Sequence, residues 1–203
     1  MAVLLAYLDG RGDLSFQVDP VNEADYYLIS KIGCPDLTGL VPSDAQEVPL
    51  PEVVASFRAQ TGNQDVTLGV SQSPQVMESF YRLPSVPRFQ PLMLSGFRRK
   101  EKPDRTEQFS ALTLRIPDCP RIITFRGTDD TIIAWKEDFQ MAVMDSVPAQ
   151  QDALCYLRWA MNAYEGDFIL CGHSKGGNLA IYASSMLPLE LQDRILAVYN
   201  FDG

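Results

Sequence analysis

The feature that most restricts the fold of this chain is a serine between a predicted strand and a predicted helix. A glycine lies two residues before this serine, and another lies two residues after it. Residues 168–171 are the apolar run Phe-Ile-Leu-Cys, and Gly-His-Ser-Lys-Gly follows at residues 172–176. A sharp turn of this kind needs glycine at Gly172 and Gly176, because a Cβ at either position would clash with its neighbours. Apolar residues at helical spacing come next. The segment therefore predicts an α/β fold with Ser174 at the carboxyl edge of a sheet.

The same turn makes Ser174 a candidate nucleophile. Its hydroxyl would stand free at the positive end of the helix dipole, and the main-chain N–H of Lys175 would point to where an oxyanion forms. Two phosphate-binding patterns are excluded, because the order is Ser-Lys-Gly rather than Gly-Lys-Ser and no G-x-G-x-x-G is present. A plain strand-to-helix turn without chemistry remains the alternative.

A second segment offers a partner for this turn. The apolar run at residues 121–125 ends in Arg126, Gly127 and Thr128. Gly127 would let the backbone approach a ligand closely, and Thr128 would be the second oxyanion donor opposite Lys175. The alternative is a simple strand exit with a helix cap at residues 128–130.

The rest of the chain predicts one α/β domain over residues 1–203. Residues 1–90 are expected to be mainly helical, and residues 91–203 to form the sheet that carries the serine turn. The expected helices span 20–33, 49–62, 73–84, 134–143 and a region from about 148, and the expected strands span 91–102, 107–116, 121–127, 167–172 and 195–203. Strands that alternate with helices predict a mostly parallel sheet, here with antiparallel edge strands and flanking helices.

Composition excludes several classes of function. The chain carries 26 acidic and 17 basic residues, a net charge of -9, which argues against nucleic-acid binding. Four cysteines without C-x-x-C spacing and a single histidine predict reduced thiols, no metal site and no cofactor. No run approaches the roughly 20 apolar residues of a membrane span, and the first ten residues lack a basic leader. We therefore expect no transmembrane segment and a cytoplasmic location.

Basic residues cluster between Arg98 and Arg105, in the first predicted hairpin. The cluster predicts either a patch for anionic lipid headgroups or phosphate, or a solvated edge whose charges prevent edge-to-edge pairing.

Several motifs together resemble a known family. FRGTDD, then Trp135 and Asp138, then GHSKGG resemble the class 3 lipases of the α/β-hydrolase superfamily. With RGDLSF, VNEADYYLIS and the final YNFDG, nearly the whole chain resembles an uncharacterised bacterial lipase-like family of that superfamily. The resemblance implies Ser174 as nucleophile, Thr128 in the oxyanion hole, a pairing of Arg126 with Asp138, and hydrolysis of a small-molecule or lipid ester through an acyl-enzyme.

The general base expected after the serine is missing from this sequence. The only histidine, His173, directly precedes Ser174, so we interpret it as structural. The later acids are Glu190 and Asp193, in a polar connection, and Asp202, a candidate triad acid or a turn former. Three explanations stay open: a C-terminally truncated hydrolase, an inactive pseudo-hydrolase that binds ligands or regulates, or an unusual base such as Lys175.

Overall fold

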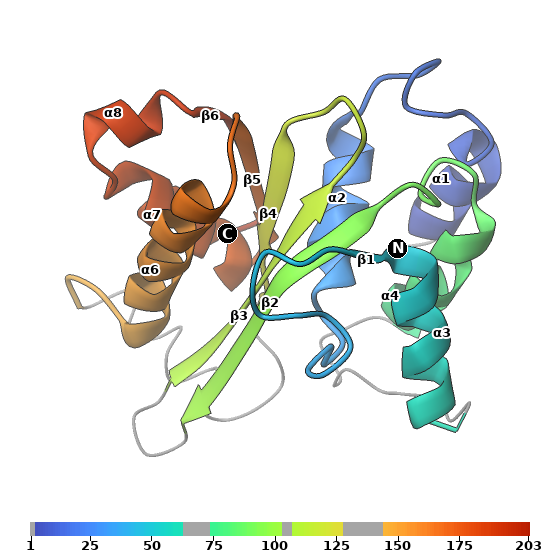
Figure 1. Cartoon of the computed structure of the whole chain (residues 1–203), viewed down its shortest axis with the longest axis horizontal. Helices are drawn as coiled ribbons and strands as arrows, with labels where there is room; N and C mark the ends of the chain where they lie inside the picture. Colours follow the sequence, from blue (N-terminus) through green and yellow to red (C-terminus); the bar gives the residue numbers. More distant parts are fainter. Residues whose placement is uncertain (1–2, 63–73, 103–106, 128–143) are drawn as a thin grey trace.

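A six-stranded sheet with helices on both faces divides the protein into three layers (Figure 1). The computed structural model describes residues 3–62, 74–102, 107–127 and 144–203. The helices are α1 (Val3–Arg11), α2 (Glu23–Ile32), α3 (Leu50–Gln60), α4 (Pro74–Arg82), the short 3-10 helix η1 (Leu83–Ser85), α6 (Pro148–Ala163), α7 (Lys175–Ser185) and α8 (Leu189–Gln192). The strands are β1 (Val48–Pro49), β2 (Met93–Lys102), β3 (Glu107–Arg115), β4 (Arg121–Phe125), β5 (Phe168–His173) and β6 (Ile195–Phe201).

The strands lie side by side in chain order, β1 to β6. The first three pairings, from β1 to β4, are antiparallel, and the last two, β4 with β5 and β5 with β6, are parallel. The sheet is therefore mixed, and antiparallel pairings outnumber parallel ones in the described residues. This corrects the mostly parallel sheet that the sequence predicts. The antiparallel part is not only an edge, because the long β2–β3 hairpin continues directly into β4.

Two apolar cores cover the two faces of the sheet. The helices α1 to α4 lie on one face, and α6 and α7 lie on the other (Figure 1). Strands β4 and β5 lie between the cores and are buried along almost their whole length, as expected for strands covered on both faces. Helices α6 and α7 lie in the connections that parallel pairing of β4, β5 and β6 requires. These connections bring the carboxyl ends of three strands to one edge.

Most of the expected elements are present. The helices expected in the first ninety residues correspond to α2, α3 and α4, and the predicted strands correspond to β2 through β6. Helix α1 was not expected, since its residues carry only a weak helical pattern. The helix expected at residues 134–143 lies outside the described residues.

The structure also bears on the expectations about membrane-spanning segments and about the cysteines. No helix in the described ranges combines the length and the apolar character that crossing a membrane would need. The four cysteines are free, with Cys34 and Cys171 buried, Cys119 partly exposed and Cys155 exposed.

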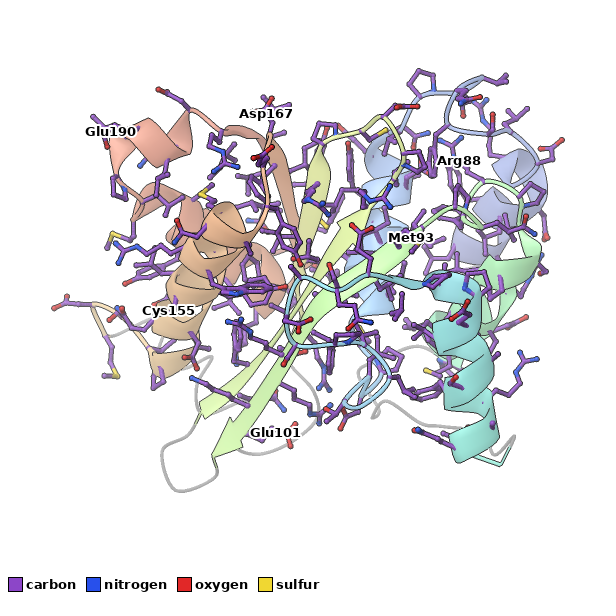
Figure 2. All side chains as sticks on the ribbon, viewed as in Figure 1. Arg88, Met93, Glu101, Cys155, Asp167 and Glu190 are labelled. Carbon is purple, nitrogen blue, oxygen red and sulfur yellow. The ribbon has the colours of Figure 1, made fainter. Side chains whose placement is uncertain are left out.

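Arg88 anchors the helical layer on one side of the sheet (Figure 2). Its side chain is completely buried and binds the equally buried Asp25 of α2, with Nε to Oδ1 at 2.8 Å and Nη2 to Oδ2 at 2.5 Å. The remaining guanidinium hydrogens are donated to the main-chain oxygens of Leu14, Asp19 and Pro20. One side chain therefore ties α2 to the loop that follows α1.

Glu47 joins the edge strand to the β3–β4 turn. Its carboxylate accepts bonds from Arg115 Nε at 2.9 Å and Nη2 at 2.6 Å, and from Arg121 Nη1 at 2.9 Å. The hydrogen bonds from Arg115, followed by those from Arg121, lower the pKa of Glu47 to about 2 against the opposing effect of burial. The ionised carboxylate therefore stabilises this corner of the fold.

We expect Glu47→Gln to lower the free energy of unfolding by about 1–2 kcal/mol at pH 7, because two charge-assisted contacts are weakened. The unfolded carboxyl titrates near its ordinary pKa of 4.5, so this stabilisation is complete above pH 4.5 and is lost as pH falls toward 2. Urea denaturation of both proteins at pH 7, 4 and 3 measures the difference. Glu165→Gln, at an exposed glutamate, is the control. A difference that does not shrink with falling pH would contradict the charge-based explanation.

Candidate active site

The turn at residues 172–176 connects β5 to α7 at the carboxyl edge of the sheet. Ser174 has φ of 54° and ψ of -131°, a left-handed conformation that a residue with a side chain rarely adopts. Such a conformation costs about 1–3 kcal/mol and persists only where the surroundings enforce it. Here the Ser174 N–H donates to Phe201 O at 2.8 Å, and Gly177 N–H donates to Ser174 O at 2.8 Å. The strained serine is therefore fixed between β6 and the first turn of α7.

The glycines of this turn are required by close backbone contacts. A Cβ on Gly172 would lie 2.2 Å from both the carbonyl carbon and oxygen of Gly176. A Cβ on Gly176 would lie 2.1 Å from the carbonyl oxygen of Phe125. A Cβ on Gly177 would lie 1.9 Å from Oδ1 of Asn200, a side-chain atom that can move more easily than backbone. The glycine spacing singled out in the sequence therefore matches positions where no side chain fits.

The end of β4 lies directly against this turn. Phe125 pairs with Gly172 in the β4–β5 register, so Arg126 and Gly127 leave the sheet beside the serine. A Cβ on Gly127 would lie 2.6 Å from His173 O and 3.7 Å from Ser174 Cβ. The structure thus brings the two segments selected from the sequence into contact.

The Ser174 hydroxyl is partly exposed and unengaged. Within the described ranges no hydrogen bond joins it to another group, and it does not cap α7. Helix α7 begins at the next residue, so the hydroxyl lies at the positive end of an eleven-residue helix. A group here is open to a ligand and lies in a field that favours developing negative charge.

Lys175 is buried although it carries an ammonium group. Its Nζ donates to the main-chain oxygen of Gln108, at 2.8 Å, on the first residues of β3. The side chain thus ties the serine turn to the β2–β3 hairpin. The role of Lys175 as an unusual base stays a prediction.

His173 turns its ring toward α2. The ring packs edge-on against Tyr27, with centroids 5.9 Å apart. Burial, followed by the positive charge of Lys31, lowers the pKa of His173, while Asp202 acts in the opposite direction. No hydrogen bond joins His173 to Ser174 in the part of the chain that the structure describes. This placement agrees with the structural interpretation of the histidine.

The three acids that follow the serine turn lie in different places. Glu190, in α8, and Asp193 are exposed and precede β6, at the edge of the sheet opposite Ser174; Figure 2 shows Glu190 at that end. Asp202 follows β6, is exposed, and has φ of 59°. Only Asp202 therefore shares an edge with Ser174.

Three residues named by the sequence fall outside the described residues: Thr128, Trp135 and Asp138. The oxyanion role of Thr128 and the pairing of Asp138 with Arg126 therefore stay predictions. Arg126 itself is buried, and its main-chain N–H extends the sheet by donating to Ser110 O at 3.0 Å. Among the described side chains, no group of three His, Cys, Asp or Glu residues is placed to hold a metal ion.

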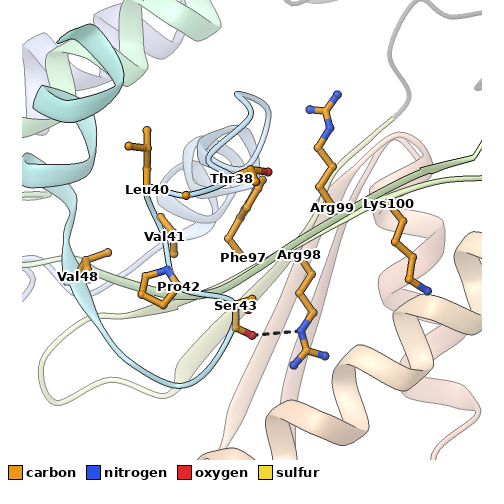
Figure 3. A pocket seen from close by; sticks show the side chains of 11 residues that line it. Thr38, Leu40, Val41, Pro42, Ser43, Val48, Phe97, Arg98, Arg99 and Lys100 are labelled. Atoms are coloured by element: carbon orange, nitrogen blue, oxygen red, sulfur yellow. Dashed lines mark hydrogen bonds between the residues drawn. The ribbon is translucent and has the colours of Figure 1, made fainter. Parts of the chain in front are cut away.

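The basic residues of the first hairpin line a separate groove. The groove has a volume of about 670 Å³ and lies between residues 38–43 and β2 (Figure 3). Arg98 donates to Ser43 O at 3.3 Å and stacks on Trp159, with Cζ 3.8 Å from the ring centroid. Arg99 pairs with Asp36 and Glu101, and Lys100 pairs with Asp152. These three cations thus have partners within the chain, and both interpretations of the basic cluster stay predictions.

Sequence reasoning did not single out Lys31, near the end of α2. Its ammonium lies 5.0 Å from the centroid of the Tyr27 ring, the same ring that contacts His173. The four-residue spacing of Tyr27 and Lys31 on a helix was a signal for their contact. Nothing local indicated that this pair would pack beside the serine turn.

Comparison with known proteins adds one result. A family model described as Mbeg1-like matches residues 83–203, more than half of the chain and the part from η1 to the end of β6. No curated protein and no solved structure matches the chain. The chain belongs to the Mbeg1-like family.

Proposed function

We propose that this protein is a serine hydrolase of the lipase and esterase type, built on an α/β-hydrolase-like fold. The observation that carries the proposal is the strained backbone of Ser174, which holds an unengaged hydroxyl between a helix N-terminus and the Arg126–Gly127 segment. A strained residue at such a position is typical of functional sites, since the fold has to stabilise it elsewhere.

The proposed reaction is acyl transfer from an ester to water. Ser174 Oγ bonds to the ester carbonyl carbon, the bond to the alcohol oxygen breaks, and the serine proton ends on the departing alcohol. Water then cleaves the acyl-serine bond and releases a carboxylic acid. The main-chain N–H groups of Lys175 and Thr128 would stabilise the oxyanion in both steps.

A fluorophosphonate probe tests this proposal, because it forms a covalent bond only with an activated serine. We expect labelling of the native protein and complete loss of labelling in Ser174→Ala and after heat denaturation. Ser185→Ala is the matched control, since Ser185 is an exposed serine of α7 that bonds to Ile181 O. Intact-protein mass spectrometry measures the adduct. No adduct on a natively folded sample would contradict the proposal.

A second candidate is a pseudo-hydrolase that binds ligands or regulates without turnover. The observation that favours it is the orientation of His173, the one histidine of the sequence, toward Tyr27. In this case the turn would retain an acyl or phosphoryl group without activating Ser174. The absence of labelling, together with measurable binding of an ester, would favour this candidate.

A further inference from the structure

Lys31 is a buried cation beside the serine turn, and none of the described residues gives it an acidic partner. Its relative exposure is 6%. Across residues 3–62, 74–102, 107–127 and 144–203, no carboxylate and no hydrogen-bond acceptor contacts its ammonium, which faces only the Tyr27 ring at 5.0 Å. Buried charges in proteins are normally paired, because burial without a partner is costly. In the part of the chain that the structure describes, the ammonium of Lys31 therefore lacks the counter-ion that burial normally requires.

Lys31 is linked to Ser174 by a chain of contacts that begins at the Tyr27 ring. Tyr27 contacts Lys31 on one side, the His173 ring at 5.9 Å, and the Phe201 ring at 5.2 Å. His173 is the chain neighbour of Ser174, and Phe201 O accepts the Ser174 N–H. The charge of Lys31 also acts, after burial, to lower the pKa of His173. The ammonium thus lies at the carboxyl edge of the sheet, on the α2 side of the serine.

The surroundings of Lys31 favour its positive charge, but they do not explain why the side chain is buried. It lies in the last turn of α2, where the helix dipole favours a cation, and it makes a cation–π contact with Tyr27. An exposed lysine would gain the same dipole interaction without losing its hydration. Here burial lowers the pKa of Lys31, with the nearby Cys34 acting in the opposite direction.

Charges of both signs act on this side of the turn: Lys31 and Arg126 are positive, and Asp202 is negative. Burial raises the pKa of the Cys34 thiol, and the positive charges of Lys31 and Arg126 oppose that rise. Two acids of this region are exposed: Asp202 follows β6, and Asp36 lies 3.8 Å from Arg99. Neither acid forms an ion pair with Lys31 in the described chain.

We propose that Lys31 binds an anionic group of the ligand that occupies the Ser174 site, so that the preferred substrate is an ester that carries a carboxylate. This inference rests on the proposed function only in that Ser174 marks the site where the ester is held. A carboxylate a few bonds from the ester carbonyl would replace the missing counter-ion of Lys31. Lys31 is thus a specificity-determining residue rather than a base.

Binding to Ser174→Ala protein tests this proposal without turnover. The two ligands are monomethyl glutarate, an ester with a free carboxylate, and dimethyl glutarate, its neutral analogue, and calorimetry measures both affinities. We expect the monoanion to bind roughly 10- to 100-fold more tightly, the usual range for one hydrogen bond to a charged group. In the Ser174→Ala, Lys31→Gln protein this preference should disappear, and Lys31→Arg should retain most of it.

Lys100→Gln is the matched control, since Lys100 is an exposed lysine already paired with Asp152, and it should leave the preference unchanged. Circular dichroism and thermal unfolding of each variant show whether the fold is kept. Equal affinity for the two esters, no binding of the monoanion, or an undiminished preference in a folded Lys31→Gln protein would overturn the proposal. Because these measurements omit the nucleophile, their outcome is separate from that of fluorophosphonate labelling.

Discussion

Gly172→Ala is expected to lower the free energy of unfolding by at least about 3 kcal/mol, the upper end for overpacking substitutions, and to abolish fluorophosphonate labelling of Ser174. The added Cβ would lie 2.2 Å from two backbone atoms of Gly176. Backbone atoms cannot rotate away as a flexible side chain can, so β5 and α7 would have to separate. The positive φ of Ser174 depends on that junction and would be lost with it.

Gly10→Ala is the matched control for this prediction. Gly10 lies in α1, and a Cβ there would meet nothing within 4 Å. Because alanine is favoured over glycine inside a helix, the control should be neutral or more stable by up to about 1 kcal/mol. Urea denaturation and mass spectrometry of the probe adduct measure both effects. A Gly172→Ala protein with native stability and full labelling would show that the backbone at Gly176 can accommodate a Cβ at position 172.

The serine turn could be predicted because all its determinants are local. The apolar strand, the glycine spacing and the helical pattern lie within about twenty residues, so the sequence shows them directly. The same holds for the β2–β3 hairpin and for helices α2, α3 and α4. Strand β1 was not predicted, because it is only two residues long and has no periodicity to recognise. The prediction of a mostly parallel sheet was wrong because the antiparallel run from β2 to β4 is a large part of the sheet and not only its edge.

The surroundings of the serine could not be predicted because they come from distant parts of the chain. Lys175 bonds to the carbonyl of Gln108, 67 positions away, and this contact exists only once β3 extends past the end of β4. Tyr27 contacts both His173 and Lys31 because α2 packs across β5 and β6, an arrangement without a local signal. Such side chains determine charge and specificity, so this part of the site needed the structure.

Arg88→Met is expected to destabilise the protein by about 3–5 kcal/mol, because it leaves the carboxylate of Asp25 buried without its counter-ion. Both side chains are fully buried, and Arg88 also satisfies the carbonyls of Leu14, Asp19 and Pro20. Arg88→Lys should recover little of this loss, since an ammonium cannot reproduce the two-point contact with the carboxylate. Urea denaturation measures the loss, and amide hydrogen exchange should show faster exchange in residues 14–20.

A double-mutant cycle separates the ion pair from the other bonds of Arg88. Asp25→Asn removes the negative charge but keeps the shape, so Arg88→Met should cost less in the Asp25→Asn protein than in the native one. We expect a coupling energy of about 1–3 kcal/mol, the upper part of the range for residues in direct contact. The loss that persists in the double mutant reports the three carbonyls, which Met cannot bind. Strictly additive effects would show that Arg88 acts on the loop alone and that Asp25 is held by Tyr7, whose hydroxyl donates to it at 2.8 Å, and by the Asn22 N–H at 3.0 Å.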